Sequence, residues 1–441
     1  MAEIYDTILK GGTLVNHSGI GQGDIGILQG RIAYIGDLSQ ASAGKTLDCR
    51  ALHILPGVID TQVHFREPGA THKEDLETGS RAAALGGVTA VFEMPNTSPL
   101  TTSADTLADK VFRAHHRMHC DFAFWVGGTR ENVVDIQELE RLPGAAGIKV
   151  FMGSSTGALL VEDDAGIAAI LAKTRRRAAF HSEDEFRLRA RMGLRVQDDP
   201  SSHPIWRDDQ AALAATQRLI AIASAARAKV HVLHISTAQE IAFLQDHKQF
   251  ASCEVTPHHL TLCADDYARL GTLLQMNPPV RDARHRAAIW QGVAQGVADI
   301  LGSDHAPHTL AEKSKPYPDS PSGMTGVQTL VPVMLDHVHA GRLSLQRFVD
   351  MTSAGPARLF QIAGKGRMAA GFDADFTIVD LKRVETIRNN WIASRCGWTP
   401  YDGVTVTGWP VGTFVRGRQV MWDGELIERG VGEPVRFLEG L

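Results

Sequence analysis

Short apolar runs that end in polar residues recur through the middle of the chain. In the clearest case, the apolar run 54–59 gives way to polar side chains at every second position: Asp60, Gln62, His64 and Arg66. Alternate residues of a strand point to the same side, so this pattern predicts a strand with four polar side chains gathered at its end. Further apolar runs lie at 89–94, 122–126, 147–151 and 229–234.

Stretches with the character of helices separate these runs, for example at 213–226 and 284–297. Alternation of strands and helices over roughly 300 residues favours a (β/α)8 barrel of the TIM type, an α/β fold whose active site lies at the carboxyl ends of its strands. A doubly wound open sheet is the alternative, but the middle of the chain has no Gly-x-Gly-x-x-Gly turn to support it.

Both ends of the chain contain short alternating runs, typical of strands, that are broken by glycines. Such runs occur at 7–10 and 31–35 near the start, and at 375–379, 412–417 and 419–422 near the end. Neither end is large enough to bury a core alone, so we expect the two to pair into one small β-sandwich. The predicted domains are a sandwich built from 1–53 and 366–441, and a barrel built from 54–365.

Composition narrows the class of protein. A net charge of −5 over 441 residues gives no sign of a nucleic-acid partner. No apolar stretch approaches the roughly 18 residues of a membrane span, and the first residues lack a basic start and an apolar signal core. Five cysteines are dispersed without a Cys-x-x-Cys pair. This pattern is typical of reduced thiols, and we expect a cytoplasmic protein with no membrane partner.

Candidate chemistry lies where the predicted strands end. Lys149 sits inside an apolar run, which is unusual because burying an ammonium without a partner is costly. Taken alone, such a lysine is more often an edge residue whose charged end reaches solvent. His181 and His234 each end an apolar run, and neutral imidazole is a common zinc ligand. His231, three residues before His234, faces the other side and is expected to be a packed histidine or the partner of a ligand.

Several of these motifs resemble the amidohydrolase superfamily, and most closely its dihydroorotase branch. The first-strand pattern of that branch is Asp-x-His-x-His-x-Arg-x-Pro-Gly, and this chain matches it from Asp60 to Gly69 except that Gln62 replaces the first histidine. The Ser-Asp-His-Ala-Pro-His motif at 303–308 and the Met-Pro-Asn-Thr motif at 94–97 also resemble dihydroorotases. The resemblance runs from about Gly57 to Asp375.

The resemblance implies a zinc site with one or two ions per chain. The metal ligands would be His64, Lys149, His181, His234 and Asp304, with Lys149 carbamylated so that it bridges two ions. Asp304 would also move the proton in catalysis. The substrate-binding residues would be Arg66, Asn96, Asn277 and His308. A glutamine amide is a weaker zinc donor than imidazole, so Gln62 leaves open whether one or two ions bind.

The implied activity is interconversion of N-carbamoyl-L-aspartate and L-dihydroorotate, a step of pyrimidine synthesis. Alternatives are an allantoinase or another cyclic-imide hydrolase, and an inactive dihydroorotase-like partner of aspartate transcarbamoylase. Hydantoinases carry a tyrosine shortly after the bridging lysine, and residues 150–155 contain none. Allantoinases usually lack the last histidine of the 303–308 motif. We expect a small-molecule substrate and a homo-oligomer, either a dimer or a tetramer.

Overall fold

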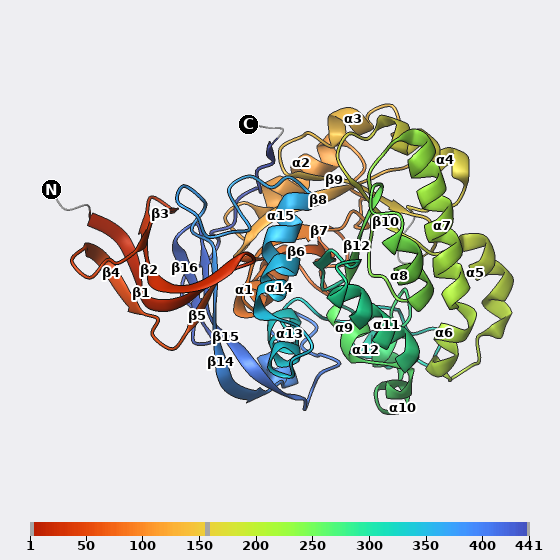
Figure 1. Ribbon diagram of the computed structural model, residues 1–441. Helices are drawn as coiled ribbons and strands as arrows, with labels where there is room; N and C mark the ends of the chain where they lie inside the picture. The colour runs from red at the N-terminus through yellow and green to blue at the C-terminus, as the bar shows by residue number, and fades with distance from the viewer. Residues whose placement is uncertain (1–3, 155–158, 439–441) are drawn as a thin grey trace.

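Two sheets organise the molecule (Figure 1). The computed structural model describes residues 4–154 and 159–438, so Ser155 at the end of the tyrosine-free segment lies outside the described residues. One sheet has eight strands and the other nine. None of the helices in the described part of the chain is long and apolar enough to cross a membrane.

The eight-stranded sheet is a parallel barrel. Its strands are β6 (Val58–Val63), β7 (Val88–Glu93), β8 (Asp121–Gly127), β9 (Ala145–Phe151), β10 (Ala178–His181), β11 (Val230–Val232), β12 (Ala251–Val255) and β13 (Ile300–Leu301). Each strand pairs with the next one along the chain. Just beyond β13, Val63 forms a parallel bridge with His305, and the backbone N–H of His64 donates to His305 O at 2.7 Å. These contacts close the barrel and confirm the predicted (β/α)8 fold.

Helices surround the barrel on its outside, as Figure 1 shows. The longer ones are α1 (Leu76–Leu85), α2 (Ala104–Ala114), α4 (Asp164–Lys173), α7 (Asp209–Ala226), α8 (Ala238–Gln245), α11 (Ala283–Ala294) and α13 (Leu330–His339). Helices α7 and α11 correspond to the predicted stretches 213–226 and 284–297. Helix α7 begins earlier than predicted, because the side chain of Asp208 accepts a hydrogen bond from Ala211 N and caps the helix there. The first turn includes Asp209 and Gln210, which are polar and lie outside the predicted stretch.

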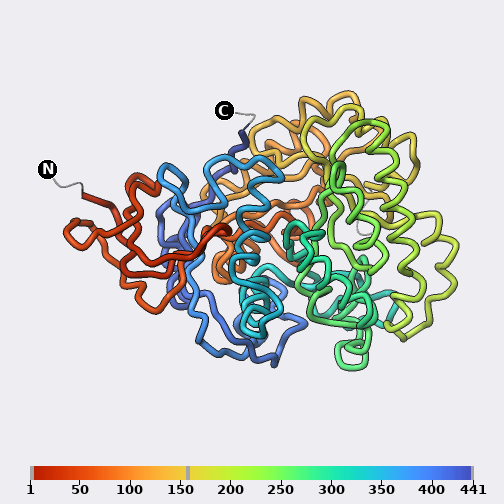
Figure 2. The backbone as a smooth tube through the Cα atoms, viewed as in Figure 1, coloured from red at the N-terminus to blue at the C-terminus, as the bar shows by residue number. Residues whose placement is uncertain are grey.

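The two chain ends build the nine-stranded sheet together. Its strands are β1 (Ile4–Asn16), β2 (Gly19–Leu28), β3 (Arg31–Gly36), β4 (Ser42–Asp48), β5 (His53–Pro56), β14 (Phe376–Thr386), β15 (Thr405–Val415), β16 (Arg418–Trp422) and β17 (Glu425–Leu426). Strand β5 pairs antiparallel with β14 and so joins the two ends. Figure 2 shows these red and blue segments side by side. The separate β domain made from both ends is confirmed, while its limits at 53/54 and 365/366 stay a prediction.

Between β14 and β15 the chain leaves this sheet and packs against the loops at the barrel mouth. Trp398 and Tyr401 of this excursion are buried in one apolar cluster with Met276 and Met324, which belong to barrel loops. The excursion therefore brings residues from the C-terminal part of the chain next to the carboxyl ends of the barrel strands.

Candidate active site

The carboxyl ends of the barrel strands surround a small cavity of about 20 Å³. It is lined by Gln62, His64, Lys149, Phe151, His181, His234, Met276, Asn277, Asp304, Ala306, Ser322 and Gly323. All five residues proposed as metal ligands therefore meet in one place, together with Gln62 and Asn277. The three other predicted residues, Arg66, Asn96 and His308, lie close by, as the contacts below show.

His64 and Asp304 form the first pair of potential ligands. The Nδ1 atom of His64 lies 2.8 Å from Asn96 Oδ1, so this nitrogen carries the proton and Nε2 keeps its lone pair. That Nε2 atom is 3.4 Å from Asp304 Oδ1. Burial, and then the charge of Arg66, hold the pKa of His64 well below its usual range. Burial raises the pKa of Asp304 to about 7, a value suited to moving protons at neutral pH.

Gln62 points toward the same carboxylate. Its Nε2 donates to Asp304 Oδ1 at 2.9 Å, while its Oε1 is buried without a hydrogen-bond partner in the described residues. In this arrangement the amide holds Asp304 in place. The amide oxygen is the only lone-pair donor that Gln62 can offer to a cation, because an amide nitrogen has none.

His181 and His234 form the second pair. The Nε2 atom of His181 lies 2.9 Å from Glu183 Oε2, so His181 carries its proton there and its Nδ1 lone pair faces His234 Nε2 at 3.0 Å. Glu183 is in turn held by Arg207, which is also buried. A carboxylate behind a histidine is the usual means of fixing the tautomer of a metal ligand.

Lys149 lines the same cavity as both pairs and has no acidic hydrogen-bond or ion-pair partner among the described residues. The side chain is 1% exposed, and its Nζ atom has Val150 O at 3.3 Å and the face of Phe151 at 4.0 Å from the ring centroid. Burial lowers the pKa of Lys149 well below its usual range, because the attraction of Asp304 and Glu254 does not offset desolvation. Burial therefore favours the neutral form of the amine, which is the nucleophilic form.

The donor atoms fit a pair of metal ions only if Lys149 contributes. Two ligand atoms of one tetrahedral zinc lie roughly 3.3 Å apart, given bonds of about 2.0–2.1 Å. The spacings of 3.4 Å in the first pair and 3.0 Å in the second match this value. Within residues 4–154 and 159–438, however, no three His, Cys, Asp or Glu side chains are placed so that they could hold one metal ion by themselves. A carbamate formed on Lys149 would supply two further oxygen donors to this set.

Arg66 and His308 lie together at the edge of the cavity. Arg66 is 7% exposed, its Nε donates to Pro307 O at 3.2 Å, and its Nη2 lies 3.3 Å from His308 Nε2. Lys73 donates to His308 Nδ1 at 3.0 Å, so His308 carries its proton on Nε2 and donates it to Ser322 O at 3.0 Å. The Nε2 atom of His308 therefore has no lone pair with which to accept a hydrogen bond from Arg66.

Asn277 is oriented by a residue outside the predicted set. His203 Nε2 lies 2.9 Å from Asn277 Oδ1 and 2.9 Å from Met276 O, so it carries the proton and donates to both. The amide oxygen of Asn277 is thus occupied, which leaves its NH₂ group to face a ligand.

Three of these residues have strained backbones. Arg66, His234 and Asp304 have φ angles of 62°, 40° and 47°, in the left-handed region that non-glycine residues seldom adopt. Such conformations persist where the surrounding structure enforces them, and they cluster at functional sites.

The sequence did not reveal the residues that hold these side chains. Glu183 stands two positions after His181, so strand alternation could have suggested it, but Arg207 and His203 are distant in the chain and follow no pattern. His231 is confirmed as a packed histidine. It is fully buried, its Nδ1 lies 2.8 Å from Ser252 Oγ, and its ring packs against Phe360.

Comparison with known proteins supports one family. The amidohydrolase family model matches residues 53–420. A dihydroorotase of Methanosarcina mazei is 35% identical over 99% of this chain and 98% of its own length. A dihydroorotase of Halobacterium salinarum is 38% identical over 87% of this chain and 89% of its own length.

Hydantoinases are similar as well. An L-hydantoinase of Paenarthrobacter aurescens is 33% identical over 98% of both chains. Among solved structures, L-hydantoinase from Arthrobacter aurescens superposes with a TM-score of 0.94 at 32% identity, over 98% of this chain and 99% of the other. The match to the family model, the barrel and the strand-end site agree, and the chain belongs to the amidohydrolase family, among its enzymes that hydrolyse cyclic amides.

Proposed function

We propose that this amidohydrolase is a zinc-dependent dihydroorotase, which interconverts N-carbamoyl-L-aspartate and L-dihydroorotate. The observation that carries the proposal is the state of Arg66. Within residues 4–154 and 159–438, its guanidinium contacts only a backbone carbonyl and the N–H side of His308. Asp304, Glu93 and Glu312 attract this buried cation, but none of them lies within ion-pair distance of it, so the arrangement favours a substrate that brings its own negative charge.

L-dihydroorotate carries such a charge as a carboxylate on its ring. A guanidinium matches a planar carboxylate with two parallel hydrogen bonds. Hydantoin, dihydrouracil and allantoin have no carboxylate, and each would leave Arg66 unpaired. We propose that Arg66, Asn96 and His308 grip the carboxylate and that Asn277 directs its NH₂ group to the ring.

For the metal site, we propose that His64 and Asp304 hold one zinc ion, that His181 and His234 hold a second, and that carbamylated Lys149 bridges them. Zinc, when bound, acidifies water and polarises a carbonyl group. Gln62 is proposed to steady Asp304 and to weaken the first metal position relative to a histidine. One ion and two ions are both compatible with this donor set.

The chain's own residues then have separate tasks. Asp304 accepts the proton of the attacking water during hydrolysis and delivers it to the ring nitrogen that leaves, and in ring closure it acts in the reverse direction. Glu183 keeps the lone pair of His181 directed into the cavity. Arg66 fixes which amide of the ring faces the reaction centre, because the carboxylate can dock in only one orientation.

The assembly and location are also proposals. The cysteines Cys49, Cys120, Cys253, Cys263 and Cys396 are free thiols, which supports a reducing compartment such as the cytoplasm. We propose a homo-oligomer, either a dimer or a tetramer. Association with aspartate transcarbamoylase is the alternative assembly.

The proposal is tested with purified protein stripped of metal and reloaded with counted zinc. We expect one to two zinc ions per chain, turnover of L-dihydroorotate that rises with zinc content, and ring closure of N-carbamoyl-L-aspartate at lower pH. Preferred turnover of allantoin or hydantoin would assign a different cyclic amide as substrate. Failure to retain zinc, with no turnover of any of these rings, would instead favour the inactive structural partner.

A further inference from the structure

A short part of the excursion between β14 and β15 crosses the mouth of the barrel. This crossing segment, residues 391–398, is fixed at its start by Gln328, whose Nε2 donates to Trp391 O at 2.7 Å and whose Oε1 accepts from Ala393 N at 2.8 Å. Its remaining residues contact the two loops that carry Arg66 and His308. Within the described chain, the strand-end residues Lys149, His181 and His234 form no hydrogen bond with the segment.

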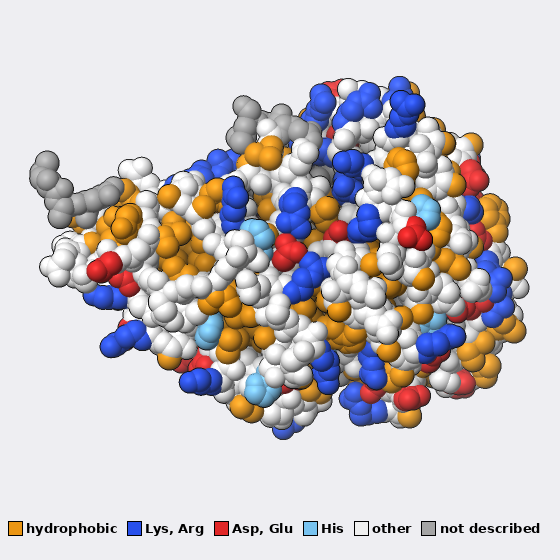
Figure 3. All heavy atoms as spheres, viewed as in Figure 1, with side chains coloured by type: hydrophobic (Ala, Val, Ile, Leu, Met, Phe, Trp, Pro, Cys, Tyr) orange, Lys and Arg blue, Asp and Glu red, His pale blue; other side chains and the backbone are white. Residues whose placement is uncertain are grey.

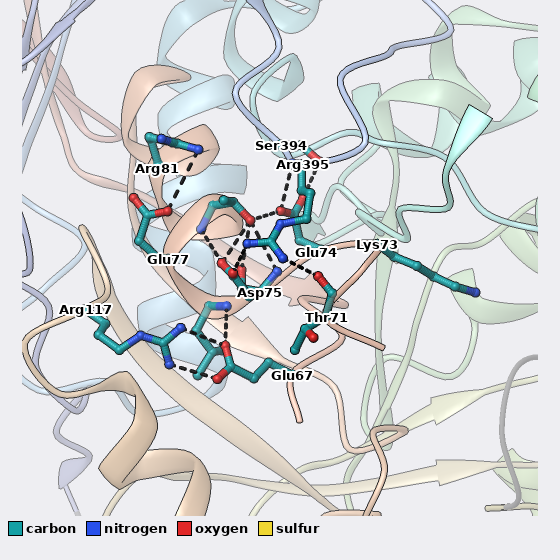
Figure 4. Close-up of polar contacts among 12 residues, drawn as sticks. Glu67, Thr71, Lys73, Glu74, Asp75, Glu77, Arg81, Arg117, Ser394 and Arg395 are labelled. Carbon is teal, nitrogen blue, oxygen red and sulfur yellow. Dashed lines mark hydrogen bonds and ion pairs between the residues drawn. The ribbon is translucent and has the colours of Figure 1, made fainter. Parts of the chain in front are cut away.

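The first contact is with the loop after β6, which carries Arg66. Figure 4 shows Ser394 and Arg395 reaching Glu74 on this loop. The backbone N–H of Arg395 donates to Glu74 Oε1 at 3.0 Å, and its guanidinium donates to Thr71 O at 2.6 Å and pairs with Asp75. Glu74 is fully buried, so its bonds to Ser394 and to the backbone N–H of Arg395 are shielded from water, whereas the guanidinium of Arg395 is exposed.

The second contact is with the loop after β13, which carries His308. Trp398 is 1% exposed, and its indole N–H donates to the backbone oxygen of His308 at 2.7 Å. Glu74 also reaches this loop, because its Oε2 lies 3.3 Å from His305 Nε2. The crossing segment and Glu74 together tie the two loops to each other.

We propose that the crossing segment sets the spacing between Arg66 and His308 and thereby determines recognition of the substrate carboxylate. Trp398 is a positioning residue that acts through His308. This inference rests on the proposed function, since it assigns a role within the same subsite. The metal ligands come from strand ends, so loosening the segment should weaken the grip on the carboxylate and leave the reaction centre intact.

Trp398→Phe tests the inference, because it removes the indole N–H and keeps an aromatic ring in the core, although the ring is smaller. The matched control is Trp290→Phe, which removes an indole N–H bonded to Leu260 O at 2.8 Å, away from both loops. For L-dihydroorotate we expect Trp398→Phe to raise KM by roughly three- to tenfold, the effect of about one hydrogen bond, with kcat nearly unchanged. For dihydrouracil, which has no carboxylate, kcat/KM should match the control.

A binding measurement separates this inference from the proposed function. Orotate has the ring and the carboxylate, so its affinity for the zinc-loaded protein can be measured by calorimetry whether or not dihydroorotate is turned over. Weaker orotate binding in Trp398→Phe than in Trp290→Phe supports the inference. Equal affinities, no binding even by the wild type, or equal losses on both substrates would overturn it.

A second variant covers the case in which Trp398→Phe fails to fold. Ser394→Ala removes one hydroxyl that donates to Glu74 and leaves the segment otherwise intact. It should weaken orotate binding in the same direction, with an unchanged metal content. If the wild type does not turn over dihydroorotate but the variants still bind orotate more weakly than the control, the assignment as a dihydroorotase is wrong. The proposed role of the segment is then retained.

Discussion

At the scale of single residues, burial determines the chemistry of this site. It favours the neutral form of the Lys149 amine, raises the pKa of Asp304 to about 7, and lowers the pKa of Arg66, which has no carboxylate within ion-pair distance among the described residues. A neutral lysine can add carbon dioxide, a carboxyl group near pKa 7 can both take and give a proton, and an unpaired guanidinium selects a carboxylate. Three side chains thus acquire their proposed roles from the same physical cause.

Lys149 gives the first prediction. Lys149→Ala should lose most of the bound zinc and all measurable activity, because each ligand pair would lack its third donor. Small carboxylates such as acetate or propionate should restore part of both, since they supply two oxygens in place of the carbamate. Metal content after gel filtration is the measurement, with Lys313→Met as a control for removing a buried lysine elsewhere. Full zinc occupancy in Lys149→Ala without added carboxylate would contradict the bridging role.

Gln62 gives the second. Gln62→His should raise zinc occupancy at limiting zinc, because imidazole is the better donor and the side chain at this position already points toward Asp304. The variant loses the amide N–H that steadies Asp304, so activity at saturating zinc should change little or fall. Zinc titrations of both proteins are compared. Superimposable curves with equal metal content would show that position 62 does not contact the metal.

At the scale of elements, the side chains at the carboxyl ends of the strands could be predicted from the sequence. Their supports, meaning the residues that hold these side chains in place, could not. Strand alternation placed Asp60, Gln62, His64 and Arg66 at one end, and the apolar runs before His181 and His234 did the same for those histidines. The supports depend on contacts between distant parts of the chain. Arg207 reaches Glu183 across 24 positions, and Ser394 reaches Glu74 across 320. Such contacts leave no repeating pattern in the sequence, because they form only when the barrel closes.

Lys313, at the end of the short helix α12 (Leu310–Lys313), gives a prediction for pH dependence. It is fully buried, donates to Pro321 O at 2.8 Å, and has a pKa that burial lowers to about 7. Above pH 7 the folded state releases this proton, while the unfolded chain keeps it up to about pH 10. Between these values the unfolded state binds more protons, so the free energy of unfolding gains up to about 1.4 kcal/mol per pH unit from this group.

The measurement is the denaturant midpoint from pH 7 to about pH 10. Relative to the wild type, Lys313→Met should show a flatter dependence and greater stability near neutral pH, since no charge is buried. Lys315→Met, at an exposed position two residues later, is the control and should follow the wild type. Parallel curves for Lys313→Met and the wild type would show that Lys313 titrates as it does in the unfolded chain.

At the scale of the whole molecule, two of the attachments between the β domain and the barrel lie at opposite ends of the barrel strands. Lys365 is buried among Asp121 of β8 and Asp373 and Asp375 near the start of β14, with nitrogen–oxygen distances of 2.6, 3.2 and 2.5 Å. The crossing segment is the second attachment and lies at the opposite end of the barrel strands. The β domain therefore contacts the barrel both away from the site and at its mouth, which the separate patterns of the two chain ends did not indicate.

The central claim is that Arg66 makes this enzyme specific for a carboxylated ring. The most direct test is the ratio of kcat/KM for L-dihydroorotate to kcat/KM for dihydrouracil, measured with counted zinc in the wild type and in Arg66→Lys. The wild type should strongly prefer dihydroorotate. Arg66→Lys should raise KM for dihydroorotate and so lower the ratio at least tenfold, because a lysine cannot replace the two parallel hydrogen bonds. A tenfold change in the ratio corresponds to about 1.4 kcal/mol. Equal kcat/KM for the two rings in the wild type, or equal losses on both in Arg66→Lys, would contradict the account.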